Sequence, residues 1–382
     1  MSSAIAPPAW RVPLSDLVVT EEDIAAVAEV YRSGWLSQGP RTQEFEAAFA
    51  AYTGAEHAVA VTNCTAALHL MAMAAGLGPG DEVIVPSLTF VATANAIAYT
   101  GAKPVFADIA GLTRPWMATD SVRARITSRT RAIVSMAYGG HPGETLALAE
   151  LARERGLLLL EDSAHALGTR IDGGHLGTFG WAGAYSFFSN KNLAVGEGGM
   201  VVCPDAEVAA RLRLLRAHGM TAISWDRHRG HAAGYDVVAT GHNFRIDEAR
   251  SALGLSRLAR LDDENALRGL LDERYRELLS GVEGVEPMRA PQGAESLAHH
   301  LFTVVLPVGA DRDGVRRALA EQGVQTSLHY PPAHRFQIYA DAGVELPLTD
   351  AYSARAITLP MFAHMSGEQV ETVVSALAEA LA

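Results

Sequence analysis

The sequence comprises 382 residues, of which 49% are hydrophobic and 19% charged, so it can bury a large core and form one large domain with a smaller one. Its 43 acidic side chains outnumber the 31 basic ones, and the net charge of −12 argues against a nucleic-acid partner because no broad cationic surface is available. Only Cys64 and Cys203 are present, which excludes a disulfide framework and a four-cysteine zinc site.

From residue 57 onward, short β-rich runs alternate with helical patterns. The runs predict strands at 57–62, 82–86, 103–108, 132–138 and 157–162, and helices at 66–77, 89–99 and 145–155. The runs 83–85 and 157–160 lack polar alternation, as strands buried on both faces do. The pattern therefore predicts an α/β fold with a mainly parallel sheet between helices, and a ligand at the carboxyl ends of its strands.

The pattern of strands and helices that the sequence predicts changes after residue 247. A long helical stretch over 247–280 could bridge two domains, and a strand at 300–306 with helices at 312–322 and 368–381 predicts a small C-terminal α+β domain. We therefore divide the chain into a large domain, 1–250, and a linking helix with a small domain, 251–382. Residues 220–240 have little periodicity and predict a long loop, the kind of segment that often carries function.

The sequence also predicts a cytoplasmic protein without a membrane span. Two cysteines fit a reducing compartment, and residues 1–16 lack the continuous apolar core of a secretory signal. The longest uncharged apolar stretch, around residues 68–77, is too short to cross a bilayer.

Lys191 stands in an aromatic and glycine-rich segment, 186–200, with no other charged residue before Glu197. Burial there would lower the pKa of its amine and favour the neutral, nucleophilic form that Schiff-base chemistry needs. By composition alone, an ordinary exposed loop lysine fits the segment about equally well.

Asp162 follows the buried run 157–160 and so falls at the carboxyl end of a strand. A buried carboxylate needs a partner, and the protonated pyridine nitrogen of a cofactor would be a suitable one. The alternative is a helix N-cap, which is the more common role for Asp in such a place.

A third segment runs from the strand at 57–62 into a helix through small polar residues. Free backbone amides at Thr65 and Ala66 would form a phosphate site at the helix start without a positive side chain. The turn is neither a Gly-x-Gly-x-x-Gly motif nor a Walker loop, so dinucleotide-binding and kinase-like interpretations lack their fingerprints.

In their order along the chain, the three segments around Thr65, Asp162 and Lys191 resemble the DegT/DnrJ/EryC1/StrS family of sugar aminotransferases, within the fold-type I, aspartate-aminotransferase-like group. The resemblance covers nearly the whole chain and includes residues 34–40, 86–93, 186–200, 241–245 and 329–330. It implies the pyridoxal-phosphate (PLP)-dependent transferase fold with a seven-stranded, mainly parallel sheet. It also implies pyridoxal 5'-phosphate held by Lys191 as a Schiff base, and no metal.

The resemblance also implies individual roles. The freed amine of Lys191 would move the proton between substrate and cofactor, and Asp162 would pair with the pyridinium nitrogen. The other expected cofactor contacts are ring stacking by Phe90, phosphate binding by Thr65, Ala66 and Ser186, and a hydrogen bond from His165 to the cofactor's 3′-oxygen. Asn243 would reach the phosphate from the partner subunit, which requires a homodimer with active sites at the subunit interface.

The family acts on nucleotide-linked keto-deoxysugars and on keto-cyclitols, with L-glutamate or L-glutamine as amino donor, in antibiotic or surface-glycan amino-sugar biosynthesis. Trp35, His329 and Tyr330 resemble positions near the substrate. Arg227 and Arg229 could meet a nucleotide diphosphate, although a solvated charged loop fits them equally well.

Three other functions remain open in principle. The pair His228-x-x-His231 lacks the helix motif of a metal hydrolase. Family members that act as sugar dehydratases typically carry histidine in place of the lysine, so Lys191 argues against that activity. A non-catalytic regulator that binds a sugar or the cofactor would have no need to keep every cofactor contact.

Overall fold

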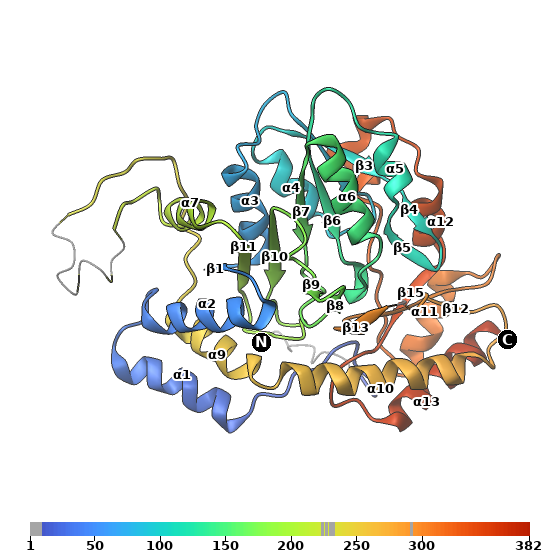
Figure 1. Ribbon diagram of the computed structural model, residues 1–382. Helices are drawn as coiled ribbons and strands as arrows, with labels where there is room; N and C mark the ends of the chain where they lie inside the picture. Colours follow the sequence, from blue (N-terminus) through green and yellow to red (C-terminus); the bar gives the residue numbers. More distant parts are fainter. Residues whose placement is uncertain (1–9, 223–224, 226–227, 229–233, 291–292) are drawn as a thin grey trace, which may run out of the picture.

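The computed structural model describes residues 10–222, 225, 228, 234–290 and 293–382. Its largest element is a seven-stranded sheet with the order β1-β11-β10-β7-β6-β2-β3 (Figure 1). Within this sheet β11 pairs antiparallel with both of its neighbours, and all other pairs are parallel. The predicted seven-stranded, mainly parallel α/β sheet is confirmed.

The strands of this sheet are β1 (His57–Val61), β2 (Glu82–Pro86), β3 (Lys103–Ala107), β6 (Thr130–Met136), β7 (Leu158–Asp162), β10 (Ala182–Ser186) and β11 (Gly199–Cys203). Alternate residues face opposite layers of helices, as the two-residue period of a strand requires. In β1, Val59 and Val61 pack toward one layer and Ala58 and Ala60 toward the other. Both faces are therefore buried, which explains the unbroken apolar runs.

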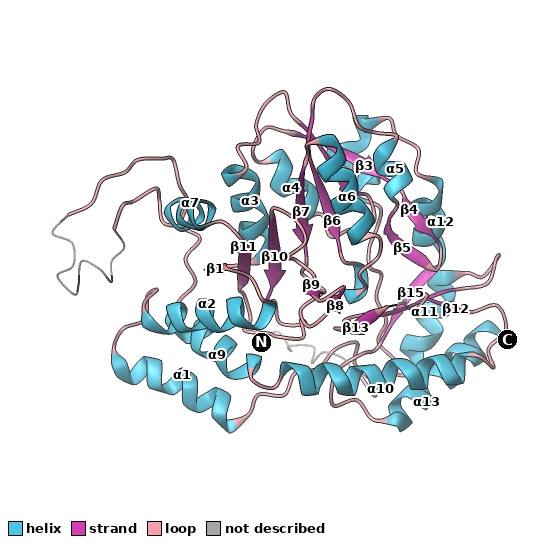
Figure 2. Ribbon diagram, in the orientation of Figure 1, coloured by secondary structure: helices cyan, strands magenta, loops and turns pink. Residues whose placement is uncertain are grey.

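Helices cover the two faces of the sheet (Figure 2). One layer contains α3 (Cys64–Ala74), α4 (Ala92–Ala98) and α7 (Ala206–Arg216). The other contains α2 (Pro40–Thr53), α5 (Thr119–Arg123), α6 (Thr145–Arg155) and α9 (Glu248–Leu258). Short elements complete this part: β4 (Ile109–Gly111), β5 (Arg114–Met117), β8 (Arg170–Ile171), β9 (Gly174–His175), β13 (Ala294–Ser296) and a 3-10 turn, Tyr138–Gly140.

A second, antiparallel sheet lies toward the C-terminus, with the order β12 (Glu286–Pro287), β14 (Phe302–Val305) and β15 (Ala356–Leu359). It packs with α10 (Leu261–Leu279), α11 (Arg312–Glu321) and α13 (Gly367–Leu381) around a separate core, as the predicted α+β pattern requires. The connections include α12 (Pro347–Arg355) and 3-10 turns at Ala333–Arg335 and Gln337–Ala342. Val12 also packs in this core, and the domain division at residue 250 stays a proposal.

The helical stretch predicted over 247–280 is two helices, α9 and α10, separated at Ala259 and Arg260. The interruption lets α9 pack against α2 and against α1 (Glu21–Ser33), while α10 continues to the second core. Leu261, at the start of α10, belongs to the core under the large sheet, and Leu271 belongs to the second core. The bridging role expected for this stretch is thus carried by α10 alone.

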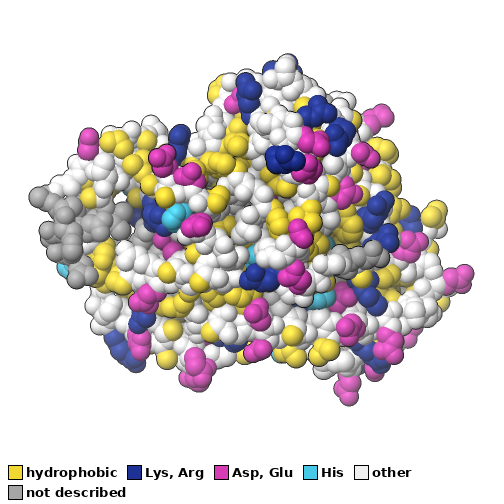
Figure 3. All heavy atoms as spheres, in the orientation of Figure 1, with side chains coloured by type: hydrophobic (Ala, Val, Ile, Leu, Met, Phe, Trp, Pro, Cys, Tyr) yellow, Lys and Arg dark blue, Asp and Glu magenta, His cyan; other side chains and the backbone are white. Residues whose placement is uncertain are grey.

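The described residues contain no helix long and apolar enough to cross a membrane. On the face shown in Figure 3, acidic and basic side chains are interspersed and no continuous basic area is visible.

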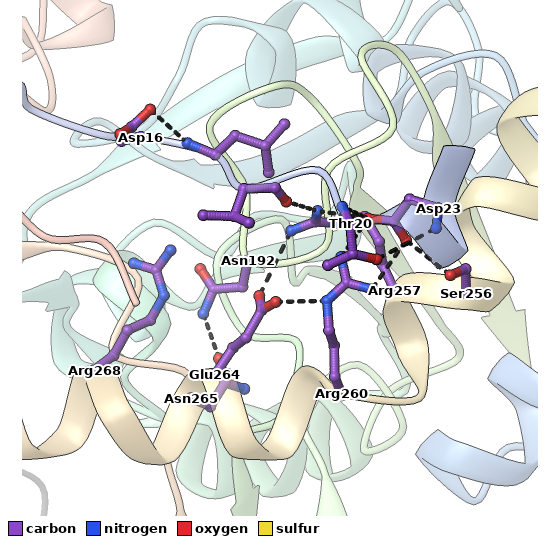
Figure 4. Close-up of polar contacts among 12 residues, drawn as sticks. Asp16, Thr20, Asp23, Asn192, Ser256, Arg257, Arg260, Glu264, Asn265 and Arg268 are labelled. Carbon is purple, nitrogen blue, oxygen red and sulfur yellow. Dashed lines mark hydrogen bonds and ion pairs between the residues drawn. The ribbon is translucent and has the colours of Figure 1, made fainter. Parts of the chain in front are cut away.

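Asp23 anchors α1 to the junction between α9 and α10 (Figure 4). Its fully buried carboxylate accepts two hydrogen bonds from the guanidinium of Arg260, at 2.9 and 2.6 Å, and one from Ser256 Oγ at 2.8 Å. Thr20, the N-cap of α1, donates its backbone N–H to the same carboxylate at 3.1 Å. Although burial opposes ionisation, these donors lower the pKa of Asp23 to about 2.

We expect Asp23→Asn to destabilise the protein by about 2 to 3 kcal/mol at neutral pH, because the partly buried Arg260 loses its charged partner. The native pKa lies below the unfolded one, so the stabilisation is complete above pH 4 and is lost as the pH falls through about 2. The difference in the free energy of unfolding between the wild type and Asp23→Asn, measured with urea, should be about half as large at pH 3 as at pH 7. Asp263→Asn, at an exposed position on α10, is the control and should leave the free energy of unfolding unchanged at both pH values.

Candidate active site

A cavity of about 730 Å³ lies where β7 and β10 end and α3 begins. Nine of the residues singled out from the sequence line it: Thr65, Ala66, Phe90, Asp162, His165, Ser186, Lys191, His329 and Tyr330. They come from segments far apart in the chain. The cavity is at the carboxyl ends of the parallel strands, where the fold class predicts a ligand.

Lys191 lies in the loop that joins β10 to the antiparallel β11, and its side chain is half-buried. Burial lowers the pKa of its amine to about 8, and the nearby Cys64 and Asp162 partly oppose the shift. A substantial part of the amine is therefore neutral near physiological pH, which is the nucleophilic form. Its Nζ lies 3.3 Å from Nε2 of His300.

Asp162 is the last residue of β7 and is 4% exposed. Its Oδ2 accepts a hydrogen bond from Thr93 Oγ1 at 2.6 Å, and its Oδ1 accepts one from the amide of Ala164 at 3.2 Å. Burial raises the pKa of this carboxyl, while Thr93, Ala164 and Lys191 partly offset the effect. A carboxylate has about four acceptor positions, so this one can still accept a hydrogen bond from a cation in the cavity.

The neighbouring Glu161 points to the opposite face of the sheet, as alternation along a strand requires. Its carboxylate accepts hydrogen bonds from the amides of Gly177 and Gly180 at 2.8 and 2.6 Å, and it does not line the cavity. Only Asp162 of the acidic pair therefore has a place in the site.

The start of α3 differs in one respect from the expected pair of free amides. Asn63, the N-cap, accepts a hydrogen bond from the amide of Ala66 at 2.8 Å, so that amide already has a partner. The amide and hydroxyl of Thr65 have no partner among the described residues and line the cavity. The helix start retains an anion site, and Thr65 is its main donor.

Two histidines and a tyrosine, His165, His329 and Tyr330, also line the cavity. The amide of Gly139 donates to Nδ1 of His165 at 3.2 Å, so the proton of this neutral ring is on Nε2, which lies 2.9 Å from the hydroxyl of Tyr330. Both nitrogens of His165 are thus occupied, and the hydroxyl proton of Tyr330 is the one left for a ligand. His329 lies beside Tyr330, and burial lowers its pKa to about 4.

Phe90 and Ser186 also line the cavity, in different surroundings. Phe90 is 55% exposed, and its ring centroid lies 5.9 Å from that of Tyr330. Ser186 is the last residue of β10, and its Oγ accepts a hydrogen bond from the amide of Phe188 at 3.4 Å. An exposed aromatic ring at the edge of a cavity is free to stack on a planar ligand.

Two predicted residues lie away from this cavity. Asn243 is exposed and does not line it. Trp35 lines a different cavity of about 500 Å³, where its ring centroid lies 4.8 Å from those of Trp225 and His228. Arg227 and Arg229 are outside the described residues.

Four residues near Lys191 and Asp162 were not singled out from the sequence: Thr93, Cys64, Asn192 and His300. Cys64 lines the cavity, and burial raises the pKa of its thiol well above the usual range. Asn192 directly follows Lys191 in the sequence, and an amide side chain beside the lysine could have been recognised as a hydrogen-bonding group of the site. Thr93 and His300 are 69 and 109 residues from their partners, and nothing local marks them.

Within the described residues, no group of three His, Cys, Asp or Glu side chains is arranged to hold a metal ion.

Comparison with known proteins gives the family. Residues 18–378 match the DegT/DnrJ/EryC1/StrS aminotransferase family. The spore coat polysaccharide biosynthesis protein SpsC of Bacillus subtilis (strain 168) is 39% identical over 380 residues, covering 96% of each chain.

Solved structures agree. The aminotransferase TlmJ from Streptoalloteichus hindustanus has a TM-score of 0.90 at 37% identity, over 97% of this chain and 98% of its own. Spr1654 from Streptococcus pneumoniae, solved in a PLP form and a PMP form, has TM-scores of 0.88 and 0.89 at 27% identity, over 97% of this chain and 98% of its own. The chain therefore belongs to the DegT/DnrJ/EryC1/StrS aminotransferase family and is an aminotransferase.

Proposed function

We propose that this aminotransferase uses pyridoxal 5'-phosphate to move an amino group from L-glutamate, or L-glutamine, to a keto group of a nucleotide-linked deoxysugar. The product would be an amino sugar of an antibiotic or a surface glycan, made in the cytoplasm. The observation that carries the proposal is the meeting of Asp162, at the end of β7, and Lys191, in the loop after the adjacent β10, in one cavity.

The residues of the cavity fit this cofactor. Asp162 is a buried carboxylate with acceptor positions to spare, which suits a protonated ring nitrogen. Thr65, at the start of α3, presents its amide and hydroxyl to the cavity, which suits a phosphate. Lys191 offers an amine with a pKa of about 8, and Phe90 an exposed aromatic face.

When bound, pyridoxal 5'-phosphate supplies an electrophilic carbon for amines and a ring that takes up negative charge. The protein residues hold and orient it. Asp162 keeps a fixed negative charge where the ring nitrogen would lie, and the Nζ of Lys191 moves the proton between substrate and cofactor. The Tyr330 hydroxyl, which His165 contacts at 2.9 Å, would be placed to donate a hydrogen bond to an oxygen on the cofactor ring, so the contact expected of His165 would be made through Tyr330.

The keto-sugar acceptor is supported by the family and by relatives. SpsC is named for spore coat polysaccharide biosynthesis. The cavity, of about 730 Å³, has room for a sugar beside the cofactor and is bordered by the hydroxyl of Tyr330 and the ring of His329. These groups suit any polyol, so a keto-cyclitol is the alternative acceptor. Arg227 and Arg229 remain candidates for the diphosphate, and Trp35 for a more distant part of the acceptor.

We also propose a homodimer whose active sites lie at the subunit interface. Asn243 is exposed and outside its own chain's cavity, as expected of a residue that serves a partner subunit. The arm that leads to Asn243, residues 234–242, pairs its Val237 with Met220. Val237 and Val238 are each more than half exposed. Apolar side chains exposed on such an arm are typical of a surface that a second chain covers.

The test is the visible absorption spectrum of the purified protein with pyridoxal 5'-phosphate, recorded before and after L-glutamate is added. We expect a yellow lysine adduct that bleaches with the donor and returns when a keto-sugar acceptor is supplied. L-glutamine in a parallel sample identifies the donor, and a keto-cyclitol in place of the sugar identifies the acceptor class. A protein that never becomes yellow, or that keeps its colour with both donors, would contradict the proposed function.

A further inference from the structure

His300 lies directly against the amine of Lys191. It precedes β14, in the second half of the chain, and is 5% exposed. Its Nε2 is 3.3 Å from Lys191 Nζ, and its Nδ1 is 2.9 Å from Oδ1 of Asn192. One imidazole ring therefore contacts two successive residues of the loop that carries the reactive lysine.

The orientation of the Asn192 amide follows from its other partners. Its Nδ2 donates to the backbone carbonyl of Ala298 at 2.6 Å and to Oδ1 of Asn265 at 2.7 Å. A backbone carbonyl can only accept, so this atom is the amino group and the oxygen faces His300. Nδ1 of His300 must consequently carry a hydrogen.

Asn265, whose contact with Asn192 is drawn in Figure 4, is oriented by a second partner on its other side. It belongs to α10, and its Nδ2 donates to the carbonyl of Leu167 at 3.1 Å. A Cβ at Gly168 would overlap this amide nitrogen, so a glycine makes room for the contact. The row of hydrogen bonds from Leu167 through Asn265 and Asn192 to His300 thus has one direction, set by backbone carbonyls.

The direction determines what His300 offers to Lys191. Burial lowers the pKa of His300 well below its usual value, and the nearby Lys191 and His165 lower it further, so the ring is neutral. A neutral ring with its hydrogen on Nδ1 has a lone pair on Nε2, which can only accept from the amine. A neutral amine has two hydrogens and one lone pair, and giving one hydrogen to His300 limits the directions its lone pair can take.

We propose that His300 is a positioning residue for Lys191. Its Nε2 accepts a hydrogen bond from the free amine and thereby fixes the direction of the amine lone pair whenever Lys191 is not bonded to a ligand. This inference rests on the proposed function, in which Lys191 alternates between bonded and free states. His300 does not itself take up the proton, because its ring stays a weak base.

The sequence allows a test that needs no turnover. Lys103, which is exposed, is the only other lysine, so ε-¹³C-lysine labelling in a Lys103→Arg background gives a single signal, from Lys191. Its chemical shift against pH reports the pKa of Lys191, which we expect at about 8. The full-length protein would be titrated both without cofactor and loaded with pyridoxamine phosphate.

Two variants of His300 distinguish a hydrogen bond from packing. In His300→Gln the amide oxygen can occupy the place of Nε2, whereas the shorter amide of His300→Asn reaches only the place of Nδ1. An acceptor stabilises an ammonium more than an amine, so His300→Asn should lower the pKa of Lys191 by about one unit, a tenfold change in its acid constant. His300→Gln should restore the wild-type value.

Asn192→Ser provides an independent route to the same result. It frees Nδ1, so the ring can place its hydrogen on Nε2 and turn a donor toward the amine, which should lower the pKa of Lys191 as His300→Asn does. His141→Phe, at a buried histidine stacked on Trp116 and outside the cavity, is the control and should leave the titration unchanged.

Equal titrations for His300→Asn, Asn192→Ser and the wild type would overturn the inference, as would equal shifts for the Asn and Gln variants. Such results would leave the proposed function intact if the wild-type holoenzyme still bleaches with glutamate. Conversely, the expected titrations in a protein that ignores both donors would support the contact and refute the function.

Discussion

Replacing Lys191 with alanine should abolish transamination. The variant loses both the nucleophile and the group that moves the proton, and we expect the rate of the half-reaction with L-glutamate to fall by at least about 10⁴-fold. The yellow lysine adduct should also disappear, although the cofactor can remain bound without a covalent bond through Thr65 and Asp162. Stopped-flow absorbance with L-glutamate measures the rate, and equilibrium dialysis measures the retained cofactor.

Lys103→Ala is the matched control because it removes the only other lysine, at an exposed position in β3. It should keep the wild-type colour and rate. A Lys191→Ala protein that transaminates at the wild-type rate would contradict the assignment of the lysine, whatever its spectrum.

The second large effect is expected at Asp162. Asp162→Asn keeps the shape of the side chain but removes the fixed negative charge opposite the ring nitrogen. A neighbouring opposite charge shifts a pKa by about one to three units, so we expect the rate with L-glutamate to fall by about 100-fold at neutral pH. The loss should become smaller at acidic pH, because the wild-type Asp162 is then protonated and loses the same charge, whereas the amide does not titrate.

Thr93→Val gives a graded comparison. Thr93 donates the hydrogen bond that lowers the pKa of Asp162, so its loss raises the pKa further. We expect near-normal rates at alkaline pH and a loss at acidic pH, where Asp162 becomes protonated and the negative charge disappears. Equal pH profiles for Asp162→Asn and the wild type would argue against an ion pair at this position.

Most of the sheet could be predicted from the sequence because its strands are buried on both faces. The run at 82–86 coincides with β2, and the helical pattern at 145–155 coincides with α6. The interruption near Arg260 was not predictable locally, since arginine is a good helix former. It accompanies the contact of Arg260 with Asp23, 237 residues earlier in the chain, and only tertiary packing reveals it.

The residues of the site also differ in whether the sequence could predict them. Lys191 and Asp162 could be singled out because each belongs to a segment of distinctive composition, and the order of those segments carries the resemblance. Their supporting contacts could not, because Thr93 and His300 are ordinary residues in their own segments. Ala66 shows the limit within a single motif, since the N-cap Asn63 takes the amide that composition alone leaves free.

The antiparallel course of β11 also bears on how the site assembles during folding. Lys191 is carried by residues 187–198, which connect two adjacent antiparallel strands, so its position depends on a local hairpin. Asp162 takes its place beside it only through the parallel pairing of β7 with β10, which joins Ala184 to Asp162 across a longer stretch of chain. Parallel, non-local pairing is the slow step in such sheets. Refolding should therefore produce a formed lysine hairpin before a competent site, and cofactor binding should follow the completion of the sheet.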